Sequence, residues 1–279
     1  MQKRIELNLA RNCLKYIIRL YGIKQIFIPY FTCPVVWNAI REENCRVKFY
    51  HIGENFLPMT RFDKNDYILY TNYFGINSKN CKQLSSIYPN LIIDNSQAFY
   101  GENYGKISFN SLRKFFNVQN GAYLYIDSVS DENFEMDYLN LEPIFMQKNY
   151  EKFLKNELIL NEEKEIKTIS PKVQKEMSKI DFENDKKTRL ELYQKYSQKF
   201  DKYNRIKLKP EKFDIPYCYP FSTDDDGIKN SIIFNKLILL QMWQNFPQNF
   251  VESKFLNDTM AFPLNDEKYA QKILEVIDC

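Results

Sequence analysis

The chain contains few glycines and a single histidine, and these shortages exclude several kinds of enzyme. Its 279 residues include seven glycines, and neither GxGxxG nor GxxxxGK[ST] occurs, so the glycine-rich loops of dinucleotide and P-loop sites are absent. His51 is the only histidine, which excludes a zinc site built on several histidines. A Ser-His-Asp mechanism would have to use His51, and no nucleophile-elbow pattern accompanies it. We therefore interpret His51 as a structural or pocket-rim residue.

Cysteine usage, charge and hydropathy narrow the class further. The six cysteines, at positions 13, 33, 45, 81, 218 and 279, show no metal or redox spacing, which favours reduced thiols. A net charge of +3, from 39 bases and 36 acids, is too small to indicate nucleic acid or a membrane surface as a partner. No apolar run approaches the ~18 residues of a membrane helix, and the basic N-terminal residues lack an apolar signal segment. We expect a cytoplasmic protein.

Apolar runs alternate with helical patterns over the first ~126 residues. A helical pattern over residues 12–22 ends at Gly22, a residue typical of helix ends. Further helices are predicted after Pro34 and over 79–88. Short apolar runs predict strands over 25–28, 46–51, 67–71, 91–94, 106–109 and 122–126. This alternation indicates an α/β fold with a mostly parallel sheet and flanking helices.

The composition changes after Asp127. Residues 147–205 are rich in charged side chains, and their apolar spacing predicts helices, including a long one near 184–203. Beyond this we expect a strand over 217–221, a helix or strand near 230–240 and a terminal helix over 266–277. The prediction is a large α/β cofactor-binding domain over 1–150, a helical connection over 151–205 and a small α+β domain over 206–279.

Asp94 and Lys114 form the most informative pair in the chain. Asp94 ends an apolar strand, and an acid at the end of a parallel strand points into the crevice where α/β sheets bind ligands. Lys114 follows the next strand after twenty residues. Pyridoxal phosphate needs a carboxylate for its ring nitrogen and an amine that links to its aldehyde. The alternatives are a carboxylate that caps the next turn and a solvated loop lysine.

Candidate phosphate donors lie close to these two residues. Ser111 could donate its hydroxyl and Arg113 charge-assisted hydrogen bonds. Ala10, Arg11 and Asn12 open the first helix, whose free N–H groups could bind an anion, although Asn12 could also be an ordinary N-cap. Gln97 follows Asp94 by three residues and could reach the hydroxyl side of the ring.

These segments resemble the pyridoxal-phosphate-dependent sugar aminotransferases of the DegT/DnrJ/StrS group, which have fold type I. Residues 93–98, IDNSQA, resemble the group's E-D-x-x-Q-A motif, and SLRK at 111–114 resembles its lysine segment. Weaker likenesses involve the phosphate turn at 9–14, the ring-side segment at 28–34 and the strand end at 73–75. The resemblance is specific for the Asp94–Gln97 and Lys114 segments and weak after residue 130.

The resemblance implies a function and roles for the site residues. We expect a shortened aminotransferase that uses pyridoxal 5′-phosphate and makes an amino sugar for a surface glycan or a secondary metabolite. Its substrate would be a nucleotide-linked keto-sugar, and its amino donor would be glutamate. Lys114 and Asp94 would be the catalytic residues, and a homodimer is implied. The cofactor-binding residues would be Ala10, Arg11, Asn12, Cys33, Asp94, Gln97, Ser111 and Lys114.

Two departures from the group's pattern leave other functions open. Ala10 replaces the group's usual glycine, and Cys33 stands where an aromatic residue often stacks on the ring. One alternative is a non-catalytic homologue that acts as a partner or scaffold subunit. A second is a sugar dehydratase, which Lys114 disfavours because dehydrating relatives carry histidine there.

Overall fold

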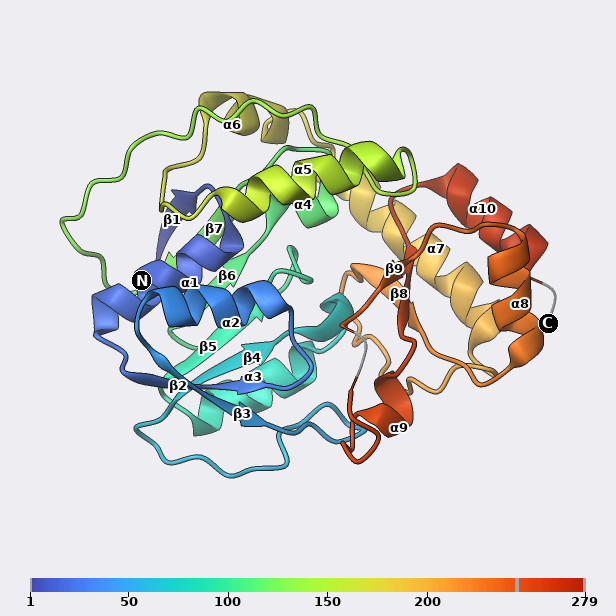
Figure 1. Cartoon of the computed structure of the whole chain (residues 1–279), viewed down its shortest axis with the longest axis horizontal. Helices are drawn as coiled ribbons and strands as arrows, with labels where there is room; N and C mark the ends of the chain where they lie inside the picture. The colour runs from blue at the N-terminus through green and yellow to red at the C-terminus, as the bar shows by residue number, and fades with distance from the viewer. Residues whose placement is uncertain (1, 244–245, 278–279) are drawn as a thin grey trace.

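The computed structural model describes residues 2–243 and 246–277 and contains two β-sheets with helices packed around them (Figure 1). The strands of the large sheet are β1 (Lys3–Leu7), β2 (Gln25–Pro29), β3 (Arg46–Tyr50), β4 (Tyr67–Thr71), β5 (Leu91–Asn95), β6 (Ile107–Asn110) and β7 (Ala122–Ile126). The small sheet contains β8 (Cys218–Phe221), β9 (Leu240–Gln241) and β10 (Met260–Pro263). The helices are α1 (Ala10–Tyr21), α2 (Pro34–Glu42), η1 (Tyr73–Gly75), α3 (Ser78–Ile87), α4 (Leu112–Phe115), α5 (Tyr150–Glu162), α6 (Pro171–Met177), α7 (Phe182–Phe200), α8 (Asp226–Phe234), α9 (Ser253–Leu256) and α10 (Glu267–Val276).

The large sheet is mostly parallel and runs in the order β1-β7-β6-β5-β4-β2-β3. The strands from β6 to β3 are parallel, whereas β7 is antiparallel to both β6 and β1. Parallel neighbours bring the carboxyl ends of β4, β5 and β6 to one edge of the sheet, where ligand sites of α/β proteins form. Asp94, opposite Thr71 in the register, lies at this edge.

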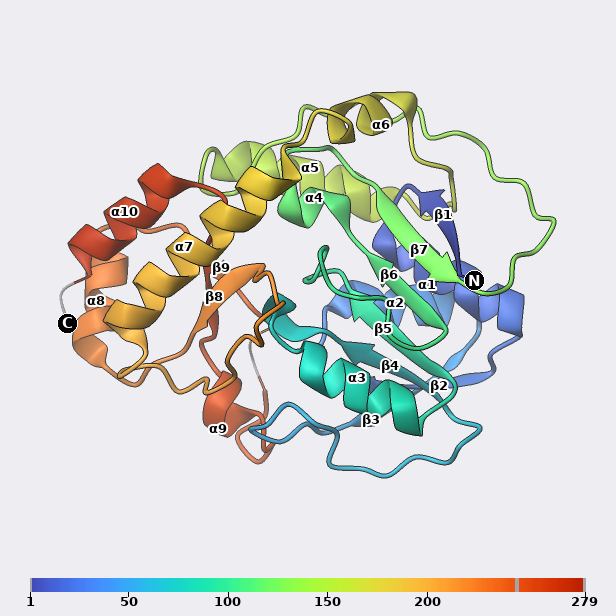
Figure 2. The ribbon, with the colours of Figure 1, turned by 180° about the vertical axis from the view of Figure 1, so that it is seen from behind.

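Helices cover both faces of the large sheet. On one face, a buried apolar cluster joins α1 and α2 to the sheet. The helices contribute side chains such as Leu14, Ile17 and Ile40, and the sheet contributes side chains such as Ile92. On the opposite face, α3 packs against β4 and β5 through Cys81 and Leu84. Figures 1 and 2 show the two faces, with α1 and α2 in front in the first and α3 in front in the second. The sheet is buried on both sides, as is usual for parallel strands.

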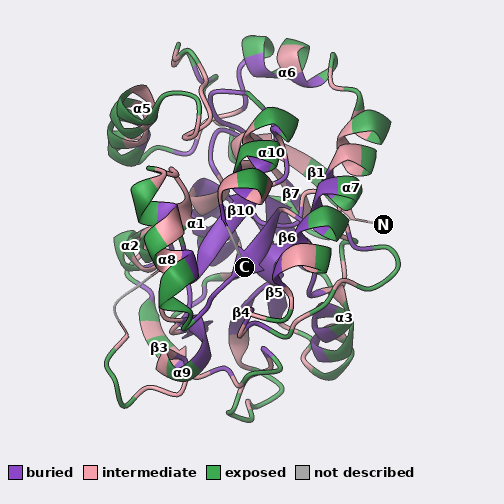
Figure 3. Cartoon of the chain, turned by 90° about the vertical axis from the view of Figure 1, so that its right-hand side faces the viewer, coloured by how far each residue is buried: buried purple, intermediate pink, exposed green. Residues whose placement is uncertain are grey.

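The small sheet, in the order β8-β10-β9, packs against α7 and is entirely antiparallel. An aromatic cluster fills this contact and includes Tyr196, Phe200 and Phe262. The same buried cluster continues to α3 and to β4 and β5. Figure 3 shows the buried strands between more exposed outer helices. The small sheet therefore shares a hydrophobic core with one face of the large sheet.

Most predicted elements are confirmed within a few residues. The structure resolves the region left open near 230–240 into α8 and β9. Strand β1 was not predicted, and α1 begins at Ala10 instead of residue 12. Gly22 ends α1 as predicted, in the left-handed conformation with φ of 59°. Among the residues that the structure describes, no helix is long and apolar enough to cross a membrane.

Candidate active site

A cavity of about 110 Å³ lies at the carboxyl edge of the large sheet. Seven of the eight cofactor-binding residues predicted from the sequence line this cavity: Ala10, Arg11, Cys33, Asp94, Gln97, Ser111 and Lys114. They come from α1, the start of α2, the end of β5 and α4. The fold thus brings together residues as far apart in the sequence as Ala10 and Lys114.

Asp94 forms the acidic wall of the cavity at the end of β5. Its side chain is buried, and one carboxylate oxygen accepts a hydrogen bond of 2.8 Å from the Ser96 N–H. Beside it in the register lies Thr71, whose buried Oγ1 has no hydrogen-bond partner among the described residues. A carboxylate with one oxygen held by the backbone can accept a further hydrogen bond from a cationic group.

Lys114 lies in the short helix α4, which directly follows β6. The described residues provide no hydrogen bond or ion pair to its Nζ atom, and its side chain is half-buried. Ser111 caps this helix through its backbone geometry, but its side chain forms no capping hydrogen bond. The buried Ser111 hydroxyl is therefore available to a ligand in the cavity.

The amino end of α1 forms the basic wall. Its N-cap residue, Leu9, has no side chain that can cap the helix, so the first N–H groups can bind an anion. The Arg11 guanidinium donates to the Leu160 carbonyl and to Asn161 Oδ1, both in α5. Burial lowers the pKa of Arg11, and the nearby positive charge of Arg113 lowers it further. Arg11 and Arg113 of α4 together form the basic wall of the cavity.

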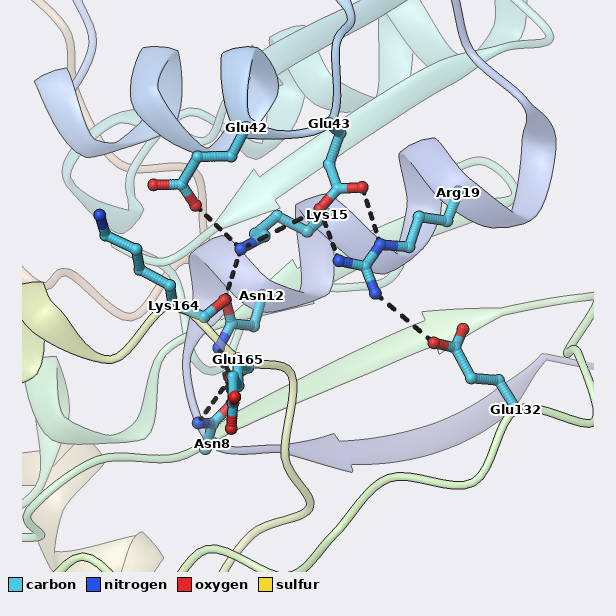
Figure 4. Close-up of polar contacts among 9 residues, drawn as sticks. All are labelled: Asn8, Asn12, Lys15, Arg19, Glu42, Glu43, Glu132, Lys164 and Glu165. Atoms are coloured by element: carbon cyan, nitrogen blue, oxygen red, sulfur yellow. Dashed lines mark hydrogen bonds and ion pairs between the residues drawn. The ribbon is translucent and has the colours of Figure 1, made fainter.

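Asn12, the eighth predicted residue, lies outside this cavity. Its side-chain amide donates to Asn8 Oδ1 at 2.9 Å and to the Glu165 carbonyl at 2.7 Å (Figure 4). Its backbone N–H donates to the Leu9 carbonyl. Asn12 thus ties α1 to the segment before α6 and is not among the residues that line the cavity.

Gln97 is held by a strained turn. Its Oε1 accepts a hydrogen bond of 2.8 Å from the Phe74 N–H, and Phe74 has a φ of 58°, which is rare for a bulky residue. The next residue, Gly75, has a φ of 73°, and a Cβ there would lie 2.7 Å from the Gln97 carbonyl oxygen. The Tyr73–Gly75 turn therefore sets the position of Gln97, and backbone strain of this kind clusters at functional sites.

Helix α5 brings an acid to the cavity. Glu157 pairs with both terminal nitrogens of Arg113, with a distance of 3.0 Å to Nη2. Arg11 also donates to a side chain of α5. Both arginines of the basic wall are therefore bound to this helix. The sequence identified residues 147–205 as helical, but it carried no signal that α5 crosses the site.

A second cavity of about 230 Å³ adjoins the first. The two share six lining residues: Cys33, Gln97, Arg113, Lys114, Glu157 and Trp243. The second cavity also has amide side chains, among them Gln147 and Asn265, which are hydrogen-bonded to each other at 3.0 Å. Lys114 and Gln97 therefore lie at the junction of the two cavities.

Three residues of the site were missed in the sequence. Thr71 lies at a strand end like Asp94, which is the one signal that could have revealed it. Trp243 and Glu157 reach the cavities from far along the chain, so no local pattern marks them.

Comparisons with solved structures place this fold among known enzymes. An aminotransferase of the DegT DnrJ EryC1 StrS type from Brucella abortus matches with a TM-score of 0.60 at 11% identity, over 98% of this chain and 84% of that one. The aminotransferase TlmJ from Streptoalloteichus hindustanus matches with a TM-score of 0.64 at 13% identity, over 98% and 84%. The sugar aminotransferase CalS13 from Micromonospora echinospora matches with a TM-score of 0.63 at 8% identity, over 98% and 86%.

No family model matches the chain, and no curated protein matches it. The structural likeness, at these identities, concerns the fold. The chain has the fold type I architecture of pyridoxal-phosphate-dependent aminotransferases, as its resemblance to the DegT/DnrJ/StrS group implied.

Proposed function

We propose that this protein is a pyridoxal-phosphate-dependent aminotransferase that acts on a keto-sugar. The observation that carries the proposal is the single cavity shared by Asp94, Lys114, Ser111 and the amino end of α1. These groups are an acid, an unpaired amine, a free hydroxyl and an anion site. The buried Thr71 hydroxyl in the same wall has no hydrogen-bond partner among the described residues, so it is a further polar group that a ligand could bind. This donor set fits pyridoxal phosphate.

Each residue would contribute a defined part of the chemistry. When bound, pyridoxal phosphate supplies an aldehyde and an electron-withdrawing ring. The Asp94 carboxylate would hold the protonated ring nitrogen, and Ser111 and the first-turn N–H groups of α1 would hold the phosphate. Lys114 would hold the cofactor at its aldehyde through Nζ. As a free amine, Nζ would serve as the base that takes a proton from the substrate carbon and returns it to the cofactor.

Two observations support a sugar as the substrate. The amide side chains Gln147 and Asn265 in the second cavity can hydrogen-bond sugar hydroxyls, and solved structures with this fold include sugar aminotransferases. The nucleotide-linked form of the keto-sugar, glutamate as the donor and a homodimeric assembly rest on the sequence resemblance. A role in surface-glycan or secondary-metabolite synthesis rests on the same likeness.

One variant tests the covalent role of Lys114. Pyridoxal phosphate linked to a lysine absorbs at the edge of the visible range, and we expect this band on adding the cofactor to the purified protein. Lys114→Ala should abolish the band, whereas Lys106→Ala, at an exposed position just before β6, should keep it. A band that survives in Lys114→Ala contradicts the proposal. Keto-sugars linked to nucleotides can then be screened with glutamate.

Glu157 supports a second candidate, a non-catalytic homologue that acts as a partner or scaffold subunit. Its carboxylate lies where it would repel a phosphate, and it already neutralises Arg113. The cofactor cavity alone is also smaller than the roughly 300 Å³ at which small-molecule sites usually begin. Absence of cofactor binding to the wild-type protein by calorimetry would favour this second function.

A further inference from the structure

Trp243 lies at the junction of the two cavities and, among the residues that the structure describes, is the one aromatic residue that lines both. It lies just after β9, in the part of the chain that forms the small sheet, yet it reaches the residues of the large sheet edge. Phe109, the other aromatic side chain of the first cavity, is buried in β6 opposite Asp94. Trp243 is therefore placed on a different wall from the sheet.

The position of Trp243 is enforced by its neighbours. Its indole packs edge-on against Phe31, with 4.8 Å between the ring centroids. Its backbone has a φ of 39°, a strained conformation for a bulky residue that persists only where the surroundings impose it. The preceding Met242 is buried, its N–H donates to the Thr259 carbonyl at 2.8 Å, and its sulfur lies 3.7 Å from Gln97 Nε2.

A buried acid fastens the same segment from the other side. Glu252 is fully buried, accepts a hydrogen bond of 2.9 Å from the Ile52 N–H and pairs with His51 Nδ1 at 2.9 Å. Met242, directly before Trp243, thus contacts Gln97, and Glu252, directly before α9, contacts the residues that follow β3. The strained Trp243 is held over the cavity by these attachments.

The chemistry of the cavity explains what an indole could do there. A ring whose nitrogen is protonated beside Asp94 is a cation, and the indole face is the best aromatic partner for a cation. Cys33, which also lines both cavities, has no ring with which to stack.

We propose that Trp243 is a cofactor-positioning residue, which packs its indole on the pyridine ring at the boundary between the cofactor and substrate cavities. This inference rests on the proposed function. The aromatic contact that Cys33 does not supply would then come from the part of the chain that forms the small sheet.

The test separates the ring contact from the phosphate contact and from the covalent link. The probes are pyridoxine 5′-phosphate, which has an alcohol in place of the aldehyde and cannot bond to Lys114, and inorganic phosphate. Calorimetry would measure the dissociation constants for the wild type, Trp243→Leu, Trp243→Phe and the control Trp37→Phe. Trp37 is the only other tryptophan and lies in α2 outside both cavities.

We expect Trp243→Leu to raise the dissociation constant of pyridoxine phosphate by about tenfold, a loss within the energy range of aromatic–cation contacts. The dissociation constant of inorganic phosphate should change by less than about twofold. Trp243→Phe should recover most of the loss, and Trp37→Phe should bind like the wild type. An equal loss for both probes, or no loss for either, overturns the inference and leaves the proposed function in place. A wild-type protein that binds neither probe overturns both.

Discussion

The carboxylate of Glu157 in α5 spans both terminal nitrogens of Arg113, on the wall of the cavity that Ser111 and Lys114 also line. An arginine beside a free hydroxyl is suited to a phosphate, and here a side chain of the protein takes that place. Helix α5 also binds Arg11 through Asn161. The protein therefore carries its own anion at the site where the proposed cofactor would bring one.

Removing this charge should strengthen cofactor binding. Glu157→Gln keeps the size of the side chain but no longer repels a phosphate, so we expect pyridoxal phosphate to bind about tenfold more tightly, or ~1.4 kcal/mol. Absorbance titration measures the change. Glu151→Gln, an exposed acid in the first turn of α5, is the matched control. Weaker binding by Glu157→Gln would show that this carboxylate supports the site instead of opposing the ligand.

Cys33 should be the most reactive of the described cysteines. It is half-exposed in the cavity wall, whereas Cys13, Cys45, Cys81 and Cys218 are buried. Burial raises the pKa of Cys45 to about 11 and raises the pKa of the other three as well, so at pH 8 all four remain protonated and unreactive.

Iodoacetamide labelling at pH 8, read by mass spectrometry in a Cys279→Ser background, should modify Cys33 at least about tenfold faster than the buried thiols. Added pyridoxal phosphate should slow labelling of Cys33 and leave the remaining sites unchanged. Labelling of Cys33 that the cofactor does not affect would place the ligand elsewhere.

Local sequence patterns predicted the helices, the strands and the sheet edge. They did not predict that α5 and the segment after β9 pack over this edge. The apolar run that ends in Asp94 and the glycine at position 22 are local signals, because each involves only a few neighbouring residues. Such signals predicted the strands, the helices and the position of Asp94 at a crevice. Strand β1 was missed because its five residues include three charged side chains, and it forms only by pairing with β7.

The remaining parts of the site depend on contacts between distant segments. Glu157 meets Arg113 across 44 residues, and Met242 meets Gln97 across 145. In the sequence, Glu157 belongs to a charged helical stretch whose acids are usually solvated. Only the packing of α5 and of the segment after β9 against the large sheet gives these residues a place in the cavity.

Gly75 should tolerate alanine much less well than Gly22 does. Both have a positive φ, of 73° and 59°, but a Cβ at Gly75 would lie 2.7 Å from the Gln97 carbonyl oxygen and 2.8 Å from that of Ile215, whereas Gly22 has no atom within 4 Å. We expect Gly22→Ala to lower the free energy of unfolding by about 1–2 kcal/mol, from backbone strain alone. Gly75→Ala should lower it by at least about 3 kcal/mol. Urea denaturation of both variants compares them, and equal losses would contradict the close approach.

Arg189 should be irreplaceable by lysine. Its guanidinium, which is 1% exposed, binds Asp185 at 2.8 Å, the Tyr217 carbonyl at 3.1 Å and the Phe115 carbonyl at 3.0 Å. The last contact joins α7 to α4, the helix that carries Lys114. Lysine keeps the charge but cannot reach three acceptors in a plane, so buried carbonyls would lose their donors.

We expect Arg189→Lys to lower the free energy of unfolding by about 2–4 kcal/mol. Lys187→Gln, at a mostly exposed position in the same helix, should change it by less than about 0.5 kcal/mol. Urea denaturation gives both values, and titration with pyridoxal phosphate shows whether α4 still presents Lys114. An Arg189→Lys variant as stable as the wild type would mean that one contact, to Asp185, carries the whole interaction.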